Sequence, residues 1–199
     1  MGISLWSIVK FSEKSLKLLD ENIFLDRLLK GNVITGATMA FKQYLKKDIL
    51  PIPNTYIHDY WIGLIATING SVIAIPEKLI LYRQHENNII GVIEKSLLKR
   101  FKIYLKNYGG IHEIRESRLK GIDKLLKKSC GMKQNEMHKQ ILMCHDFWFS
   151  QSQLEKRGVF NGIKIISRDI LKGNYCKYYN GLRSIVRDLI CLLIHRNNI

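Results

Sequence analysis

In the second half of the chain, residues 93–199, apolar positions recur every three or four residues, which predicts a helical region. Its first helix is basic and amphipathic, because lysines and arginines lie mostly opposite the apolar stripe. Gly-Asn at 173–174 and Asn-Gly at 180–181 separate the later helices. The apolar positions of the expected helices are Leu97, Phe101, Tyr104, Leu105 and Tyr108, then Leu119, Ile122, Leu125 and Leu126, then the stretch Glu136–Arg157, then Ile163, Ile166 and Ile170, and finally Leu182, Ile185, Leu189 and Leu193.

The first half, residues 1–92, has a mixed pattern, and the fold class that it predicts is α/β. Gly36 interrupts the first of the expected strands, where a glycine often marks a bulge or a place where another backbone or a ligand comes close. The expected boundary between the two halves lies near Gly91–Ile93, beyond the last of the three prolines. Helices are predicted over Asp20–Gly31, Lys42–Ile49 and Tyr56–Asn69, and strands over Val33–Phe41, Ser71–Ile75 and Lys78–Gln84.

Charge separates the same two halves. The chain of 199 residues has a formal charge of +15, and 46% of its residues are apolar, which excludes disordered and collagen-like classes. Residues 1–92 carry +2 and residues 93–199 carry +13. The basic half predicts an acidic partner such as an anionic membrane surface, a phosphorylated substrate or nucleic acid. Nucleic acid ranks lowest, because no helix-turn-helix, RNP or zinc-finger pattern is present.

Cysteine content and hydropathy indicate the compartment. The four cysteines are widely spaced and contain no CxxC pair, so they favour neither a disulfide framework nor a structural zinc site. No apolar run reaches the roughly 18 to 20 residues that span a bilayer. We therefore expect a cytoplasmic protein that lies at the inner face of the cell membrane through its basic helices.

Residues 31–91 combine polar groups with an apolar framework. They include GNVITGATMAF from Gly31 and PIPNTYIHDYWIGLIATINGSVIAIPEKLILYRQHENNIIG from Pro51. Three pieces, Ile34–Phe41, His58–Trp61 and Tyr82–Gly91, follow the order ITGxTMAF, HDxW and YRQHxxNxxG. This block resembles the C-terminal part of the catalytic domain of family 2 glycosyltransferases, above all the bacterial rhamnosyltransferase-like members that build surface polysaccharides.

The resemblance implies a GT-A-type mixed sheet and a role for each matching residue. Asp59 would be the general base that takes the proton of the acceptor hydroxyl during inverting transfer. His85 would ligate a divalent metal, Mn or Mg, that holds the nucleotide diphosphate, although imidazole suits manganese only moderately. The remaining implied substrate-binding residues are Gly36, His58, Trp61, Arg83 and Gln84.

Each role has a structural alternative. Asp59 can simply favour the positive end of a helix dipole, and His85 can be a hydrogen-bonded loop histidine. Trp61 can stack on a sugar or belong to the core, since it shares helical spacing with Leu64. Gly36 can merely relieve crowding.

The family's nucleotide-binding half, a Rossmann-like region with an Asp-x-Asp motif, has no counterpart before Gly31. The sequence therefore predicts a C-terminal fragment whose partners are a nucleotide-sugar donor, a saccharide or lipid-linked acceptor and a separate N-terminal half. The alternative is a non-catalytic remnant or interaction module, whose basic helices bind membrane, partner protein or nucleic acid.

Overall fold

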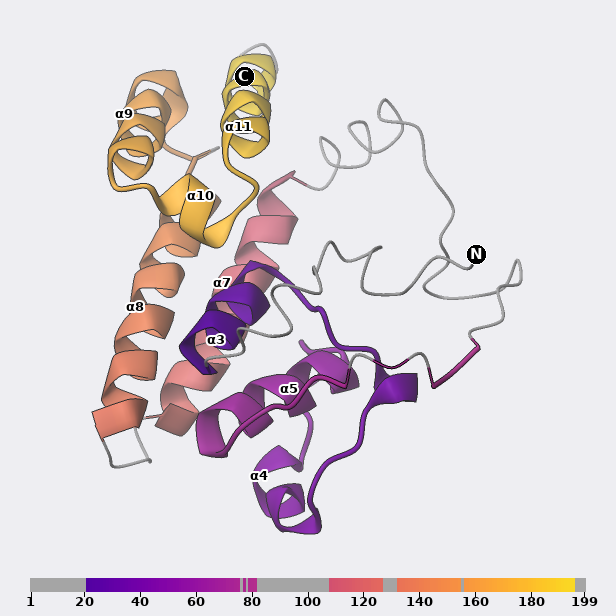
Figure 1. Ribbon diagram of the computed structural model, residues 1–199. Coiled ribbons are helices and arrows are strands. Elements are labelled where there is room, and N and C mark those ends of the chain that lie inside the picture. The colour runs from indigo at the N-terminus through magenta and orange to yellow at the C-terminus, as the bar shows by residue number, and fades with distance from the viewer. Residues whose placement is uncertain are drawn as a thin grey trace. The chain divides into compact units, whose positions relative to one another are not determined.

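The structure of the chain is a computed structural model that describes residues 21–75, 77, 79–81, 108–126, 132–154 and 156–195 (Figure 1). The chain divides into two compact units, residues 1–100 and 101–199. The boundary that charge and composition predict near residue 92 falls between residues 82 and 107, outside the described residues.

The described part of the first unit is built on two helices, α3 (Glu21–Lys30) and α5 (His58–Asn69). Between them lie the 3-10 turns η1 (Gly36–Thr38) and η2 (Gln43–Leu45) and the short helix α4 (Lys46–Ile49). The Tyr60 hydroxyl donates a hydrogen bond to the Leu28 carbonyl at 2.6 Å and so joins α5 to α3. The buried apolar side chains of this unit are Phe24, Leu25, Leu28, Leu29, Leu45, Ile49, Tyr56, Trp61, Ile62, Leu64, Ile65 and Ile68.

The predicted α/β fold, a GT-A-like mixed sheet, is wrong for the described part of the chain, which is helical and contains no strand. Val33–Phe41 begins extended but turns through η1, where the Met39 amide donates to the Gly36 carbonyl. Ser71–Ile75 and residues 79–81 of the third predicted strand also lack a strand partner. Alternating apolar residues indicate that one face of a segment is buried. A strand forms only where a neighbouring backbone supplies hydrogen bonds to that segment.

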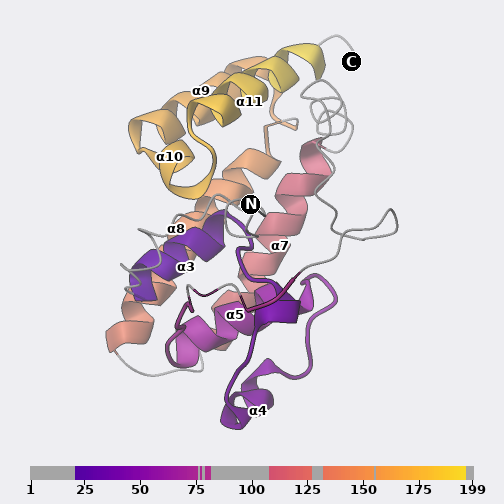
Figure 2. The same ribbon diagram turned by 45° about the vertical axis from the view of Figure 1, so that its right-hand side comes forward.

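The described residues of the second unit are helical, as their periodicity predicts. The basic amphipathic helix expected from Ile93 lies outside the described residues up to Tyr108. The antiparallel pair α7 (Tyr108–Leu126) and α8 (Met132–Ser152) packs side by side (Figure 2). A second antiparallel pair, α9 (Gly158–Leu171) and α11 (Leu182–His195), is joined through the short helix α10 (Asn174–Tyr178). Gly162 lets α9 approach α11, because a Cβ there would lie 2.5 Å from a methyl carbon of Leu192.

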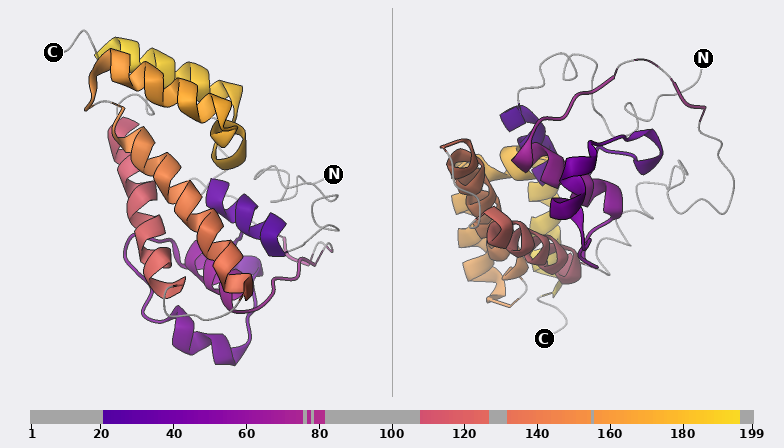
Figure 3. Two further views of the ribbon diagram at one scale, coloured as in Figure 1. Left: turned by 90° about the vertical axis from the view of Figure 1, so that its left-hand side faces the viewer. Right: turned by 90° about the horizontal axis from the view of Figure 1, so that it is seen from below.

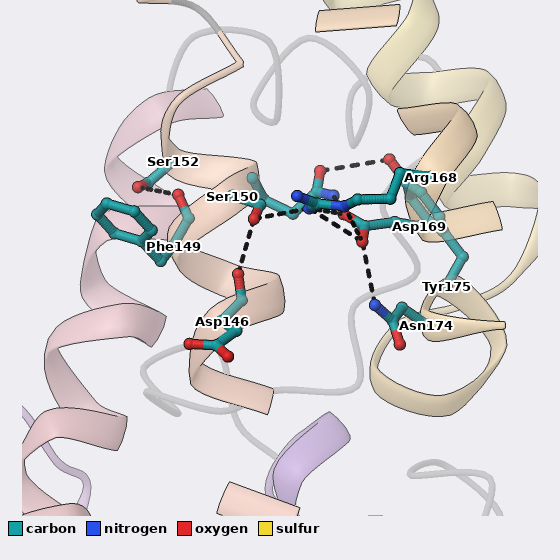
Figure 4. Close-up of polar contacts among 9 residues, drawn as sticks. Asp146, Phe149, Ser150, Ser152, Arg168, Asp169, Asn174 and Tyr175 are labelled. Carbon is teal, nitrogen blue, oxygen red and sulfur yellow. Dashed lines mark hydrogen bonds and ion pairs between the residues drawn. The ribbon is translucent and has the colours of Figure 1, made fainter. Parts of the chain in front are cut away.

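A buried carboxylate, Asp169, joins α8, α9 and α10 (Figure 4). Its Oδ1 accepts hydrogen bonds from Arg168 and from the Asn174 amide at 3.0 Å, and its Oδ2 accepts from Arg168 and from the Gln151 amide at 3.3 Å. The Tyr175 hydroxyl donates to the Gln151 carbonyl oxygen at 3.3 Å. Burial, with a further contribution from Asp188, raises the pKa of Tyr175, so its phenol remains a hydrogen-bond donor.

Aromatic rings and two arginines form a second cluster where α7, α8 and α11 meet. The Arg115 guanidinium lies 4.2 Å from the ring centroid of Trp148, and the Arg187 guanidinium lies 4.6 Å from that of Tyr179. The His112 ring stacks on Trp148 at 5.5 Å and is fully buried. Burial, together with the positive charges of Arg115 and Arg187, lowers the pKa of His112 to about 3.

The lowered pKa of His112 predicts a loss of stability in mild acid. Below pH 6.5 the unfolded chain protonates this histidine, whereas the folded chain does not until about pH 3. The stabilisation is therefore complete above pH 6.5 and is lost as the pH falls from 6.5 toward 3. Between pH 7 and pH 5, this one group is expected to lower the free energy of unfolding by about 2 kcal/mol.

Urea unfolding at pH 7 and pH 5 measures this effect in matched variants. His112→Phe keeps an aromatic ring against Trp148 and should lose about 2 kcal/mol less than the wild type over this interval. His58→Gln removes an exposed histidine of the other unit and should retain the wild-type pH dependence. If the free energy of unfolding of His112→Phe depends on pH as it does in the wild type, the pKa of His112 does not differ between the folded and unfolded states.

Candidate functional site

Asp59 lies in the first turn of α5, the position that the sequence predicts. It is one of the few buried carboxylates of the described chain, at 5% exposure. The positive end of the helix dipole favours a negative charge there. Its two oxygens contact the segment that follows α3, so two of the three motif pieces that carry the resemblance meet at this side chain.

Three N–H groups hold the carboxylate. Oδ1 accepts from the Asn32 side-chain amide at 2.9 Å and from the Tyr60 backbone N–H at 2.7 Å. Among the described residues, Oδ2 accepts from the Gly36 backbone N–H alone, at the longer distance of 3.3 Å. Because each carboxylate oxygen can accept about two hydrogen bonds, Oδ2 has room for one more donor. The arrangement fixes the segment from Asn32 to Gly36 over the start of α5 and leaves one oxygen able to receive a proton.

Gly36 and His58 lie against one another at the rim of this site. A Cβ on Gly36 would lie 2.5 Å from Nε2 of His58, so only glycine fits without moving the imidazole. His58 itself is exposed. The neighbour of Gly36 is a side chain, which corresponds to the relief of crowding and not to a bulge or to the approach of another backbone or a ligand. The substrate-binding role of both residues stays a prediction.

Trp61 lies in the core of the first unit. It is 3% exposed, and its indole N–H donates to the Ile49 carbonyl at 2.7 Å. The Tyr56 ring packs against it at a centroid distance of 4.9 Å. This arrangement favours the core role of Trp61 over stacking on a sugar.

The residues assigned to the diphosphate side, Arg83, Gln84 and His85, lie outside the described residues. Across the described ranges, no group of three or more His, Cys, Asp and Glu is placed to hold a metal ion. Asp59, the carboxylate of the His58–Trp61 motif piece, accepts hydrogen bonds from N–H donors on both oxygens. The divalent metal that the resemblance implies stays a prediction, because its expected ligand His85 lies outside the described residues.

The sequence does not identify Asn32 as a site residue, although Asn32 lies in the GNVITG segment. Its amide nitrogen holds Asp59, and its carbonyl oxygen accepts from the Ile34 backbone N–H at 2.9 Å. The available signal was the position of Asn32 two residues before Ile34, where the first motif piece begins. A surface hollow of about 500 Å³ is a separate feature of this unit and contains none of the predicted site residues; its lining is Gln43, Tyr44, Lys46, Lys47 and Leu50.

No family model, curated protein or solved structure matches the chain. The likeness to family 2 glycosyltransferases thus depends on the three motif pieces themselves. Among the helices of the described ranges, none combines the length and the apolar character needed to cross a membrane.

Proposed function

We propose that this chain is the acceptor-side part of an inverting glycosyltransferase that transfers a sugar, rhamnose by resemblance, from a nucleotide-sugar donor to a saccharide or lipid-linked acceptor. The observation that supports this function is the meeting of the GNVITG segment and the HDYW helix at the Asp59 carboxylate. The two pieces are more than 20 residues apart in the chain, and hydrogen bonds from Asn32 and Gly36 to Asp59 bring them together.

In this proposal Asp59 receives the acceptor proton on Oδ2. The acceptor O–H bond breaks, its oxygen forms a bond to the anomeric carbon, and the nucleoside diphosphate leaves with the electrons of its own bond to that carbon. Oδ1 remains tied to Asn32 and Tyr60, which orients the carboxylate while Oδ2 reacts. In the same proposal His58, which is exposed, contacts the acceptor.

The test is the release of dTDP from dTDP-rhamnose in the presence of a saccharide acceptor and Mn²⁺. It is performed with the full chain alone and with the nucleotide-binding half of a complete family member added as a second polypeptide. Asp59→Asn should lower the rate by about 100-fold or more, because a positioned general base contributes at least that factor. Circular dichroism establishes that the variant is folded.

Asn32→Ala is the matched control, since it removes one donor to Oδ1 and leaves Oδ2 unchanged. If Asp59 is the base, Asn32→Ala should lose much less activity than Asp59→Asn, because the base remains and the Tyr60 N–H still holds Oδ1. Equal losses in the two variants would assign Asp59 the structural role of holding the segment after α3. Absence of release from the wild type in both arrangements would contradict the proposed function and favour a non-catalytic module.

A further inference from the structure

The surface of α9, α10 and α11 carries an excess of positive charge, although Lys156, Arg168 and Arg187 each have an acidic partner. Residues 156–195 contain only two carboxylates, Asp169 and Asp188, and these are 1% and 0% exposed. Both acids therefore lie inside the unit, and the charges that face solvent over this range are positive. The basic residues of this range are Lys156, Arg157, Lys164, Arg168, Lys172, Lys177, Arg183 and Arg187.

Helix α11 has a buried side and, opposite it, an exposed apolar stripe. Its buried side consists of Ser184, Asp188, Cys191 and Leu192. Its outer side carries large apolar residues spaced by four, four and three positions, which forms one stripe along a helix. This outer stripe consists of Leu182, Val186, Ile190 and Leu193, which are 73, 48, 36 and 54% exposed.

Helix α9 repeats the arrangement. Gly162, Ile165, Ile166 and Asp169 point into the unit, whereas Phe160, Ile163, Ile170 and Leu171 are exposed. The two helices lie side by side (Figure 3). We call the exposed apolar residues of α9 and α11, together with the neighbouring Lys164, Lys172 and Arg183, the outer face.

We propose that the outer face binds an anionic membrane surface. An interfacial helix buries an apolar stripe in the headgroup region while basic side chains beside it contact anionic lipid, and the outer face offers both features on adjacent helices. Nucleic acid would use the basic residues but leave the apolar stripes unexplained. A second copy of the chain would cover the stripes but bring like charges together. The proposal is independent of sugar transfer, since it depends only on the second unit.

Co-sedimentation of the full chain with vesicles tests the proposal. The chain should bind vesicles of mixed phosphatidylcholine and phosphatidylglycerol and leave pure phosphatidylcholine vesicles largely unbound. Raising the salt from 0.1 M to 1 M shortens the Debye length from about 10 Å to about 3 Å and should release the chain. The assay needs no donor or acceptor sugar, so its result stands apart from the transfer assay.

Two variants separate the contributions of charge and apolar contact. Lys164→Glu/Lys172→Glu/Arg183→Glu should weaken binding by about 100-fold at low salt, because each basic residue near the surface contributes about fivefold. Phe160→Ser/Leu171→Ser/Leu182→Ser should abolish stable sedimentation, because these side chains are 72, 88 and 73% exposed and supply the stripe. The substituted residues face solvent, so circular dichroism should remain that of the wild type.

The matched controls lie on α7 and α8. Ile114→Ser/Leu142→Ser/Met143→Ser removes apolar residues that are 51, 41 and 45% exposed, and Lys139→Glu reverses a charge on α8; both should bind vesicles like the wild type. Equal binding to neutral and anionic vesicles, or full binding by either outer-face variant, would overturn the proposal. Failure of the wild type to bind vesicles would also overturn the proposal. Dimerisation through the stripes would then favour a second copy of the chain, and binding to a DNA duplex would favour nucleic acid.

Discussion

Trp148→Ala is expected to lower the free energy of unfolding of the second unit by about 4 kcal/mol, a change of nearly a thousandfold in the unfolding equilibrium. Trp148 is 1% exposed. The centroid of its ring lies 4.9 Å from that of Phe147 and 4.8 Å from that of Tyr179. Its removal opens a cavity between helices that cannot close without moving α7. It also takes away the ring face on which the Arg115 guanidinium lies at 4.2 Å.

Hydrogen exchange of the full chain measures the loss in the unit where it occurs. Protection of amides in peptides from α8 should fall, whereas peptides from α5, in the other unit, should remain as protected as in the wild type. Phe149→Ala, one residue further along α8, is the control, because Phe149 is 43% exposed and should cost only about 1 kcal/mol. A loss in Trp148→Ala no larger than in this control would contradict the packing described for the cluster.

Helices were predictable here wherever the apolar period was long. The expected segment Tyr56–Asn69 corresponds to α5, which begins at His58, and the expected stretch Glu136–Arg157 corresponds to most of α8. Strand formation was not predictable for Val33–Phe41, because a strand depends on a partner elsewhere in the chain. Its residues instead turn at Gly36 and bond to Asp59.

Which face of a helix lies inside was predicted less well than the helix itself. The expected stripe of α11 included Leu182 and Leu193, yet both are exposed, and Cys191 is buried in their place. Periodicity cannot choose a side when apolar residues occupy two opposite sides. Asp169 and Asp188 are also buried, whereas a charged residue in a helix normally predicts the side that faces solvent. Their burial could be predicted only with knowledge of the groups that pair with them in the fold.

The site shows the same limit at the level of single residues. The spacing of the HDYW motif placed Asp59 correctly in the first turn of a helix. The three N–H groups around it come partly from Asn32 and Gly36, which only the fold brings within reach. Trp61 fitted a sugar-stacking role equally well in sequence, and its bond to the Ile49 carbonyl is what favours the core.

Asp169→Asn is expected to lower the free energy of unfolding by about 3 kcal/mol. The carboxylate accepts from Arg168, Gln151 and Asn174, and an asparagine amide has one acceptor oxygen in place of two. Its new N–H₂ group would face another N–H donor, so a buried donor would lose its partner. Arg168 is 46% exposed in its side chain and can regain water, which keeps the cost below that of isolating a fully buried charge.

The control for this prediction is Asp146→Asn on α8, which makes the same change in charge. The Asp146 side chain is 84% exposed, and it is its backbone carbonyl, not its carboxylate, that accepts the Ser150 hydroxyl at 2.8 Å. Urea unfolding should therefore show a change within about 0.5 kcal/mol for Asp146→Asn and a much lower midpoint for Asp169→Asn. Similar midpoints would mean that the loss of one negative charge, common to both variants, sets the stability. A large difference would assign the loss of stability to the hydrogen bonds that join α8, α9 and α10.

Because α9 and α11 present the outer face, loss of the Asp169 bonds should also weaken vesicle binding, although no residue of that face is changed.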